Sequence, residues 1–99
     1  MNSELFFRPE AERELIEAVN WYEERIKGLG SSFLLSIEAA IDSISRNPKA
    51  YPKIYKNIRR ILIRRFPFGI YYFVEKERII VLAVFHAHRN PKEWEKRIS

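Results

Sequence analysis

Two histidines near the end of the chain are the side chains best suited to chemistry. His86 and His88 lie two residues apart, so in a strand both rings project from one face. Imidazoles there bind a metal or transfer a proton near neutral pH. A metal would find few further ligands, because the chain has no cysteine and no Asp or Glu between Glu77 and Glu93. We therefore expect no metal and no other cofactor.

Two interpretations of the histidines remain. In the first, one of them acts as a general acid beside Arg89 and the arginines of a preceding strand. In the second, both form hydrogen bonds that anchor the end of the last strand to a terminal helix.

The arginines fall in a stretch that has no acidic side chain. Between Asp42 and Glu75 the chain carries eight basic residues and no Asp or Glu; the basic residues are Arg46, Lys49, Lys53, Lys56, Arg59, Arg60, Arg64 and Arg65. Residues 1–45 hold 4 Lys/Arg and 9 Asp/Glu, a charge of −5, and residues 46–99 hold 14 and 4, a charge of +10. This asymmetry predicts a surface that binds nucleic acid, an acidic protein segment or a membrane surface.

The predicted basic strand carries the candidate binding residues. Arg60 and Arg64 share one face with Leu62 between them, and guanidinium groups bind phosphate in bidentate geometry. The same face also suits an acidic partner or plain solvation. Tyr51 and Tyr55 fall in a predicted loop. We expect partner binding by Arg59, Arg60, Arg64, Arg65, Tyr51 and Tyr55.

The elements that position these residues follow from the spacing of apolar side chains. Helical spacing over about residues 9–27, with Pro9 at the start, and again from Ser31 or Ser32 to Arg46 predicts a helical hairpin around Gly28-Leu29-Gly30. A loop is expected over residues 48–56. Strands are expected at 5–7, 58–65, 70–75 and 79–85, the last apolar on both faces and therefore central.

The predicted order is β-α-α-β-β-β, followed by a short helix from Pro91. Strands gathered after helices indicate an α+β fold, with the helical hairpin packed on an antiparallel sheet. Ninety-nine residues predict a single domain over 1–99. The chain lacks a signal peptide, a membrane span, a Gly-rich phosphate loop and a paired-carboxylate site, so we expect a cytoplasmic protein without membrane contact.

Several motifs together resemble a known family. They are Pro9 to Leu15 followed by Trp21-Tyr22, Gly30 with Phe33, Asn47-Pro48, Arg59-Arg60, Phe66-Pro67-Phe68 with Ile70-Tyr71-Tyr72, and the ending from Val84 to Trp94. In order and spacing they resemble the RelE/ParE superfamily of toxins from type II toxin–antitoxin systems, which includes plasmid-stabilisation proteins. The resemblance covers nearly the whole chain and implies the same β-α-α-β-β-β fold. It also implies a toxin that inhibits growth and is neutralised by a cognate antitoxin with an acidic segment.

The superfamily divides by target. RelE-like members cut mRNA on the translating ribosome without a metal, whereas ParE-like members poison DNA gyrase. In a RelE-like reading, the resemblance assigns catalysis to Arg60, Arg64, His86, His88 and Arg89. However, Leu62 and Gly69 stand where RelE-like members carry a lysine and an arginine, and Trp94 stands near the position of a tyrosine.

The departures favour a ParE-like toxin that is not itself an enzyme. The alternatives are a metal-independent, ribosome-dependent mRNA endoribonuclease and a degenerate, non-toxic binding module. Each would act as a homodimer or within a toxin–antitoxin hetero-oligomer.

Overall fold

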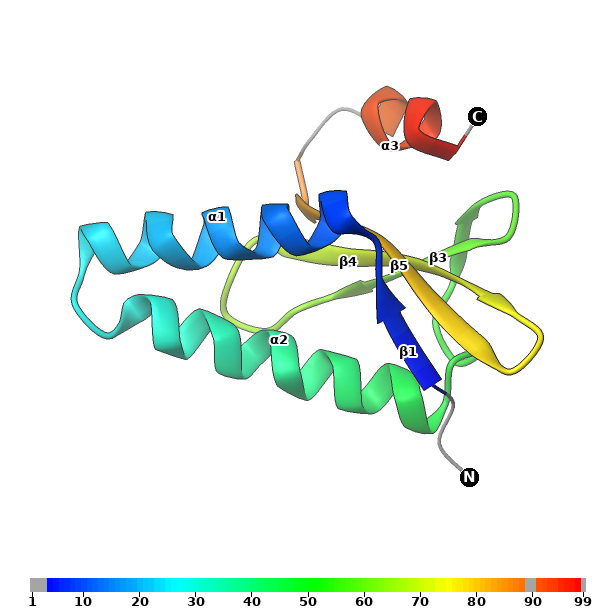
Figure 1. Cartoon of the computed structure of the whole chain (residues 1–99), viewed down its shortest axis with the longest axis horizontal. Helices are drawn as coiled ribbons and strands as arrows, with labels where there is room; N and C mark the ends of the chain where they lie inside the picture. The colour runs from blue at the N-terminus through cyan, green and yellow to red at the C-terminus, as the bar shows by residue number, and fades with distance from the viewer. Residues whose placement is uncertain (1–3, 89–90, 99) are drawn as a thin grey trace.

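The computed structural model of the chain describes residues 4–88 and 91–98, which form five strands and three helices (Figure 1). In chain order they are β1 (Glu4–Phe7), α1 (Pro9–Arg25), α2 (Leu29–Arg46), β2 (Lys53–Tyr55), β3 (Ile58–Leu62), β4 (Phe68–Glu75), β5 (Arg78–His86) and α3 (Pro91–Ile98). The α+β class and the helical hairpin on a mainly antiparallel sheet are therefore confirmed.

The hairpin of α1 and α2 is closed by a carboxylate. Gly28 adopts a left-handed conformation, with φ of 90°, which a residue without Cβ tolerates. The side chain of Glu23 in α1 then accepts hydrogen bonds from the N–H groups of Gly28 (2.8 Å) and Gly30 (2.9 Å). These bonds satisfy donors that the first turn of α2 leaves unpaired. The second helix accordingly begins at Leu29, earlier than Ser31 or Ser32.

The sheet has the strand order β1-β5-β4-β3-β2. Among the described strands, only β1 and β5 run parallel to each other. The central position expected for residues 79–85 is confirmed, because β5 pairs with both β1 and β4. The prediction of a loop over residues 48–56 was wrong for Lys53–Tyr55. These residues form β2, because Lys53 and Tyr55 pair with β3. The strand β3 ends at Leu62, before the predicted limit of 65.

Each face of the sheet has its own core. Figure 1 shows α1 and α2 side by side over one face, where Phe33, Ile37 and Ile44 of α2 pack against β4 and β5. The other face carries a smaller cluster that includes Tyr71 and Phe85. Sheet side chains alternate between the two clusters, as the two-residue period of strands requires.

A bulge in β5 interrupts this alternation. The pairing with β4 shifts between Tyr71 and Tyr72, so Leu82 and Ala83 both face the smaller cluster. Val84 then returns to the side of the helices. One extra residue in a strand moves each later side chain of that strand to the opposite face of the sheet. The side chain of His86, at the end of β5, therefore lies on the side of α1.

An ion pair covers the outer edge of β5 where β1 ends. Pairing with β1 reaches only Val81. Further along, the N–H of Val84 donates to Glu14 Oε1 (3.1 Å), and Arg97 Nη1 donates to the carbonyl of Leu82 (3.1 Å). The two side chains thus supply one acceptor and one donor, as a neighbouring strand would, and they fasten α3 to the rest of the fold.

Candidate functional site

The predicted binding arginines occupy different environments. Arg60 lies on the sheet face away from the helical hairpin, with its stem over Gly69. A Cβ on Gly69 would lie 3.3 Å from Cγ and from Cδ of Arg60 and 3.4 Å from Leu62 Cδ2. Leu62 is itself 55% exposed. The open part of this face thus carries one arginine beside an apolar side chain and a glycine.

Arg59 points to the opposite face and is engaged within the fold. Its Nη1 donates to the carbonyls of Lys49 (3.1 Å) and Tyr51 (2.6 Å). Tyr72 supports the same segment, because its hydroxyl donates to the carbonyl of Pro48 (2.7 Å). Arg59 and Tyr72 therefore hold the connection between α2 and β2 in place.

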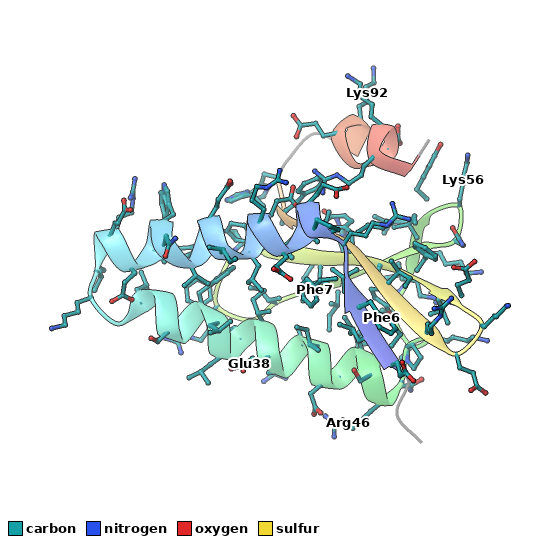
Figure 2. All side chains as sticks on the ribbon, viewed as in Figure 1. Phe6, Phe7, Glu38, Arg46, Lys56 and Lys92 are labelled. Carbon is teal, nitrogen blue, oxygen red and sulfur yellow. The ribbon has the colours of Figure 1, made fainter. Side chains whose placement is uncertain are left out.

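Tyr51 and Tyr55 are both half-buried. Tyr51 packs against the core beneath the helices, and Tyr55, in β2, packs against the smaller core. The ammonium of Lys56 lies 5.3 Å from the Tyr55 ring centroid, and Figure 2 shows the Lys56 side chain at the outer end of the β2–β3 turn. Each tyrosine leaves only part of its ring open to a partner.

Arg64 and Arg65 are exposed and follow β3 after one residue, Ile63. They line a cleft of about 520 Å³ between α2 and β3. Arg65 has a φ of 73°, in the left-handed region. The backbone thus turns sharply at the point where the two guanidinium groups meet the cleft.

The histidines line a second and larger cleft, of about 710 Å³, between α1 and the ends of β4 and β5. Its lining residues are Glu14, Glu17, Ala18, Trp21, Tyr22, Pro67, Phe68, Val84, His86 and His88. The ring of His86 lies 5.5 Å from that of Phe68 and 5.4 Å from that of His88, centroid to centroid. The N–H of His88 donates to His86 Nδ1 (3.3 Å), which places that nitrogen as an acceptor.

Of the described catalytic candidates, the structure brings His86 and His88 together and places Arg60 and Arg64 elsewhere. Arg60 lies on the sheet face away from the helices, Arg64 borders the cleft beside α2, and the histidines border the cleft beside α1. Arg89 lies outside the described residues. Among the residues that are described, no group of three or more His, Asp or Glu side chains is placed to hold a metal ion.

Sequence reasoning missed the pairing of Glu14 with Arg97. Two short contacts join them, Arg97 Nη2 to Glu14 Oε2 at 2.8 Å and Arg97 Nη1 to Glu14 Oε1 at 2.9 Å. The hydrogen bond to Glu14 raises the pKa of Arg97. The guanidinium also lies 4.6 Å from the centroid of the Phe85 ring. No local sequence pattern distinguishes Glu14 from its acidic neighbours Glu12 and Glu17.

The described helices include none that is long and apolar enough to cross a membrane. Residues 5–91 match the family described as ParE toxin of type II toxin-antitoxin system, parDE. Toxin ParE2 of Mycobacterium tuberculosis is 30% identical over 89 residues, which make up 89% of this chain and 85% of that protein.

Solved structures share the fold at lower identity. The isolated Escherichia coli RelE toxin superposes with a TM-score of 0.65 at 21% identity, covering 98% of this chain and 99% of RelE. The chromosomal ParDE system of P. aeruginosa gives 0.64 at 14% identity (87% and 97% covered), and the M. tuberculosis toxin-antitoxin complex RelBE2 gives 0.61 at 17% (87% and 99%). By the family match and the ParE2 similarity, the chain belongs to the ParE toxin family of type II toxin–antitoxin systems.

Proposed function

We propose that this toxin arrests growth by inhibiting DNA gyrase, and that a cognate antitoxin neutralises it. The match over residues 5–91 to the ParE family and the similarity to toxin ParE2 support the ParE branch. Structural neighbours that are toxin–antitoxin complexes support an antitoxin partner.

The separation of the candidate catalytic residues is the observation that favours gyrase inhibition over RNA cleavage. Cleavage at a ribose 2′-OH needs a base, an acid and phosphate-binding groups within hydrogen-bonding reach of one scissile bond. Here Arg60 has Leu62 and Gly69 as neighbours on its sheet face, while His86 and His88 border a cleft on the side of the helices. An inhibitor that acts by binding needs no such convergence.

A supercoiling assay with the purified protein tests this proposal. We expect the chain to reduce supercoiling by gyrase and to trap gyrase on cleaved DNA, seen as linear plasmid after detergent and protease treatment. An equimolar amount of the cognate antitoxin should abolish both effects. Unchanged supercoiling with no trapped breaks would overturn gyrase as the target.

A ribosome assay separates the alternative. Primer extension on translated mRNA would reveal cuts in the ribosomal A site, and Arg64→Ala would remove them if the chain is a nuclease. We expect no such cuts. Induced expression that leaves growth unaffected would instead identify a non-toxic binding module.

A further inference from the structure

The cleft between α1 and the ends of β4 and β5 is walled by a row of rings. The ring centroids of Trp21 and Tyr22 lie 5.1 Å apart, those of Tyr22 and Phe68 6.1 Å, and those of Phe68 and His86 5.5 Å, with angles of 89°, 65° and 66° between the ring planes. His88 ends the row, 5.4 Å from His86. Rings that meet edge to face turn their faces in different directions, as the walls of an aromatic cage do. The volume of about 710 Å³ lies in the range of small-molecule sites.

Carboxylates make this cleft negative within a basic chain. The chain has a net charge of +5, yet the described residues that line the cleft include Glu14 and Glu17 and no lysine or arginine. Arg97 neutralises Glu14 through contacts of 2.8 and 2.9 Å. Glu17, three residues further along α1, is exposed, and no residue that the structure describes pairs with its carboxylate. The cleft therefore attracts a cation.

The same chemistry holds a cation at two neighbouring points of the fold. The Arg97 guanidinium lies against the Glu14 carboxylate and 4.6 Å from the centroid of the Phe85 ring. The Arg25 guanidinium lies 3.6 Å from the centroid of the Trp21 ring. Neither arginine lines the cleft, so the side of Trp21 that faces the cleft remains available to a cation from outside.

The shortage of hydrogen-bond acceptors decides which kind of cation fits. A primary ammonium has three N–H donors and a guanidinium has five. Arg97 meets this need with both Glu14 oxygens and the carbonyl of Leu82. Among the described side chains that line the cleft, Glu17 is the carboxylate without a partner, and most of the remaining surface is carbon. N–H donors left unpaired on such a surface are destabilising, whereas a quaternary ammonium has none and spreads its charge over its alkyl groups.

We propose that this cleft binds a small molecule that carries a quaternary ammonium group. The ammonium lies against the row of rings from Trp21 to His86, and the Glu17 carboxylate balances its charge. The alkyl groups contact the carbon surface of Pro67 and Val84. This ligand site goes beyond the proposed function and does not depend on it, because the binding does not involve gyrase.

A titration with three probes tests the recognition chemistry. Choline carries a quaternary ammonium, neohexyl alcohol is its uncharged isostere with carbon in place of nitrogen, and ethanolamine is its unmethylated counterpart. Each is added to the ¹⁵N-labelled protein at constant ionic strength. We expect choline to cause saturable shifts of the Trp21 indole signal and of the His86 and His88 amide signals, with a dissociation constant in the millimolar range. Neohexyl alcohol and ethanolamine should each bind at least about tenfold more weakly.

Matched variants define the site. Glu17→Gln removes the charge and keeps the size of the side chain, so choline binding should weaken about fivefold at low salt. Glu12→Gln makes the same charge change at an exposed position outside the cleft and should weaken binding by less than about twofold. Trp21→Ala should weaken binding about tenfold, and Trp21→Phe, which restores a ring, should recover most of this loss. The His86 and His88 amides report binding in these two variants, and circular dichroism verifies that each variant is folded.

Several outcomes would overturn the proposal. An absence of saturable shifts with choline would show that the cleft does not bind this cation. Equal binding of neohexyl alcohol would show that the cleft recognises apolar surface alone, and equal or tighter binding of ethanolamine would contradict the preference for a quaternary ammonium. Unchanged choline binding in both Glu17→Gln and Trp21→Ala would place the ligand elsewhere. Shifts of the same signals with protein concentration alone would show that a second copy of the chain occupies the cleft.

Discussion

At the residue scale, the Glu14–Arg97 pair joins α3 to α1 through two short contacts, of 2.8 and 2.9 Å. The Arg97 side chain is 22% exposed and that of Glu14 is 16% exposed, so solvent screens the pair only in part. We predict that Arg97→Met lowers the free energy of unfolding by about 2 kcal/mol, because it removes charge-assisted hydrogen bonds from a largely buried carboxylate. Urea unfolding followed by circular dichroism measures this.

The matched control is the exposed ion pair of α2. Arg46 lies on the outside of α2 (Figure 2). It pairs with Asp42, and the two side chains are 64% and 62% exposed, respectively. Arg46→Met should therefore cost no more than about 0.5 kcal/mol. Equal losses for the two variants would contradict the role given to Arg97.

A second prediction at this scale concerns pH. Burial raises the pKa of Tyr72 to about 12, against the charge of Arg59, which lowers it, while Tyr51 adds a smaller upward effect. The unfolded value is about 10. The folded state therefore favours the protonated Tyr72 hydroxyl. The contribution of this preference to the stability of the fold is fully present below pH 10 and is lost as the pH rises through 12.

We predict that the wild type loses stability more steeply than Tyr72→Phe between about pH 10 and 12. At pH 8 the same variant should cost about 1 kcal/mol, because the hydrogen bond to the Pro48 carbonyl is lost. Urea unfolding across this pH range measures both effects. Parallel curves for the two proteins would show that Tyr72 ionises with its ordinary pKa.

At the element scale, the approach of α1 to α2 depends on Gly30. A Cβ there would lie 2.6 Å from the carbonyl oxygen of Val19 and 2.9 Å from Glu23 Cβ, so the helices would have to move apart. We predict that Gly30→Ala lowers the free energy of unfolding by about 2 kcal/mol, because the added methyl group overpacks the contact between the two helices. Thermal and urea unfolding measure the loss.

Gly28→Ala separates crowding from backbone strain. At Gly28 a Cβ would meet nothing within 4 Å, but φ is 90°. Gly28→Ala should lower the free energy of unfolding by about 1 kcal/mol, because only the left-handed backbone conformation disfavours the alanine. A larger loss for Gly28→Ala than for Gly30→Ala would refute close helix packing as the limiting factor.

At the scale of the whole molecule, the basic half of the chain is predicted to meet the antitoxin. Reversing Arg60, Arg64 and Arg65 to Glu should weaken antitoxin binding at least about tenfold at low salt and remove its salt dependence, because screened charge pairs drive the contact. Arg59 is left unchanged, since it bonds two carbonyls of its own chain. Titration calorimetry at two salt concentrations measures the effect.

The control carries the same change in net charge elsewhere. Lys27, Lys76 and Arg78 are exposed and lie outside the cleft beside α2. Reversing these three to Glu should lower affinity by less than about threefold at moderate salt, through long-range charge alone. Comparable losses in both triple variants would show that net charge, rather than the surface, controls binding.

The elements whose apolar residues repeat were predictable. The spacing of Ala11, Leu15 and Ala18 identifies α1, and that of Phe33, Ile37 and Ile44 identifies α2, because a helix that buries one face must repeat about every 3.6 residues. The strand β2 was missed because three residues carry no readable period and form a strand only by pairing with β3.

The sequence by itself determined the α+β fold, the helical hairpin, the central place of β5 and the uneven charge, because these follow from local periodicity and composition. Only the tertiary structure decided how the charged and aromatic residues are used. The bulge at Leu82 and Ala83, hidden within a continuous apolar run, sends His86 to the side of α1 and away from Arg60. The partners Glu14 and Arg97 stand 83 residues apart, and contacts between such distant residues depend on the closed fold rather than on any local pattern.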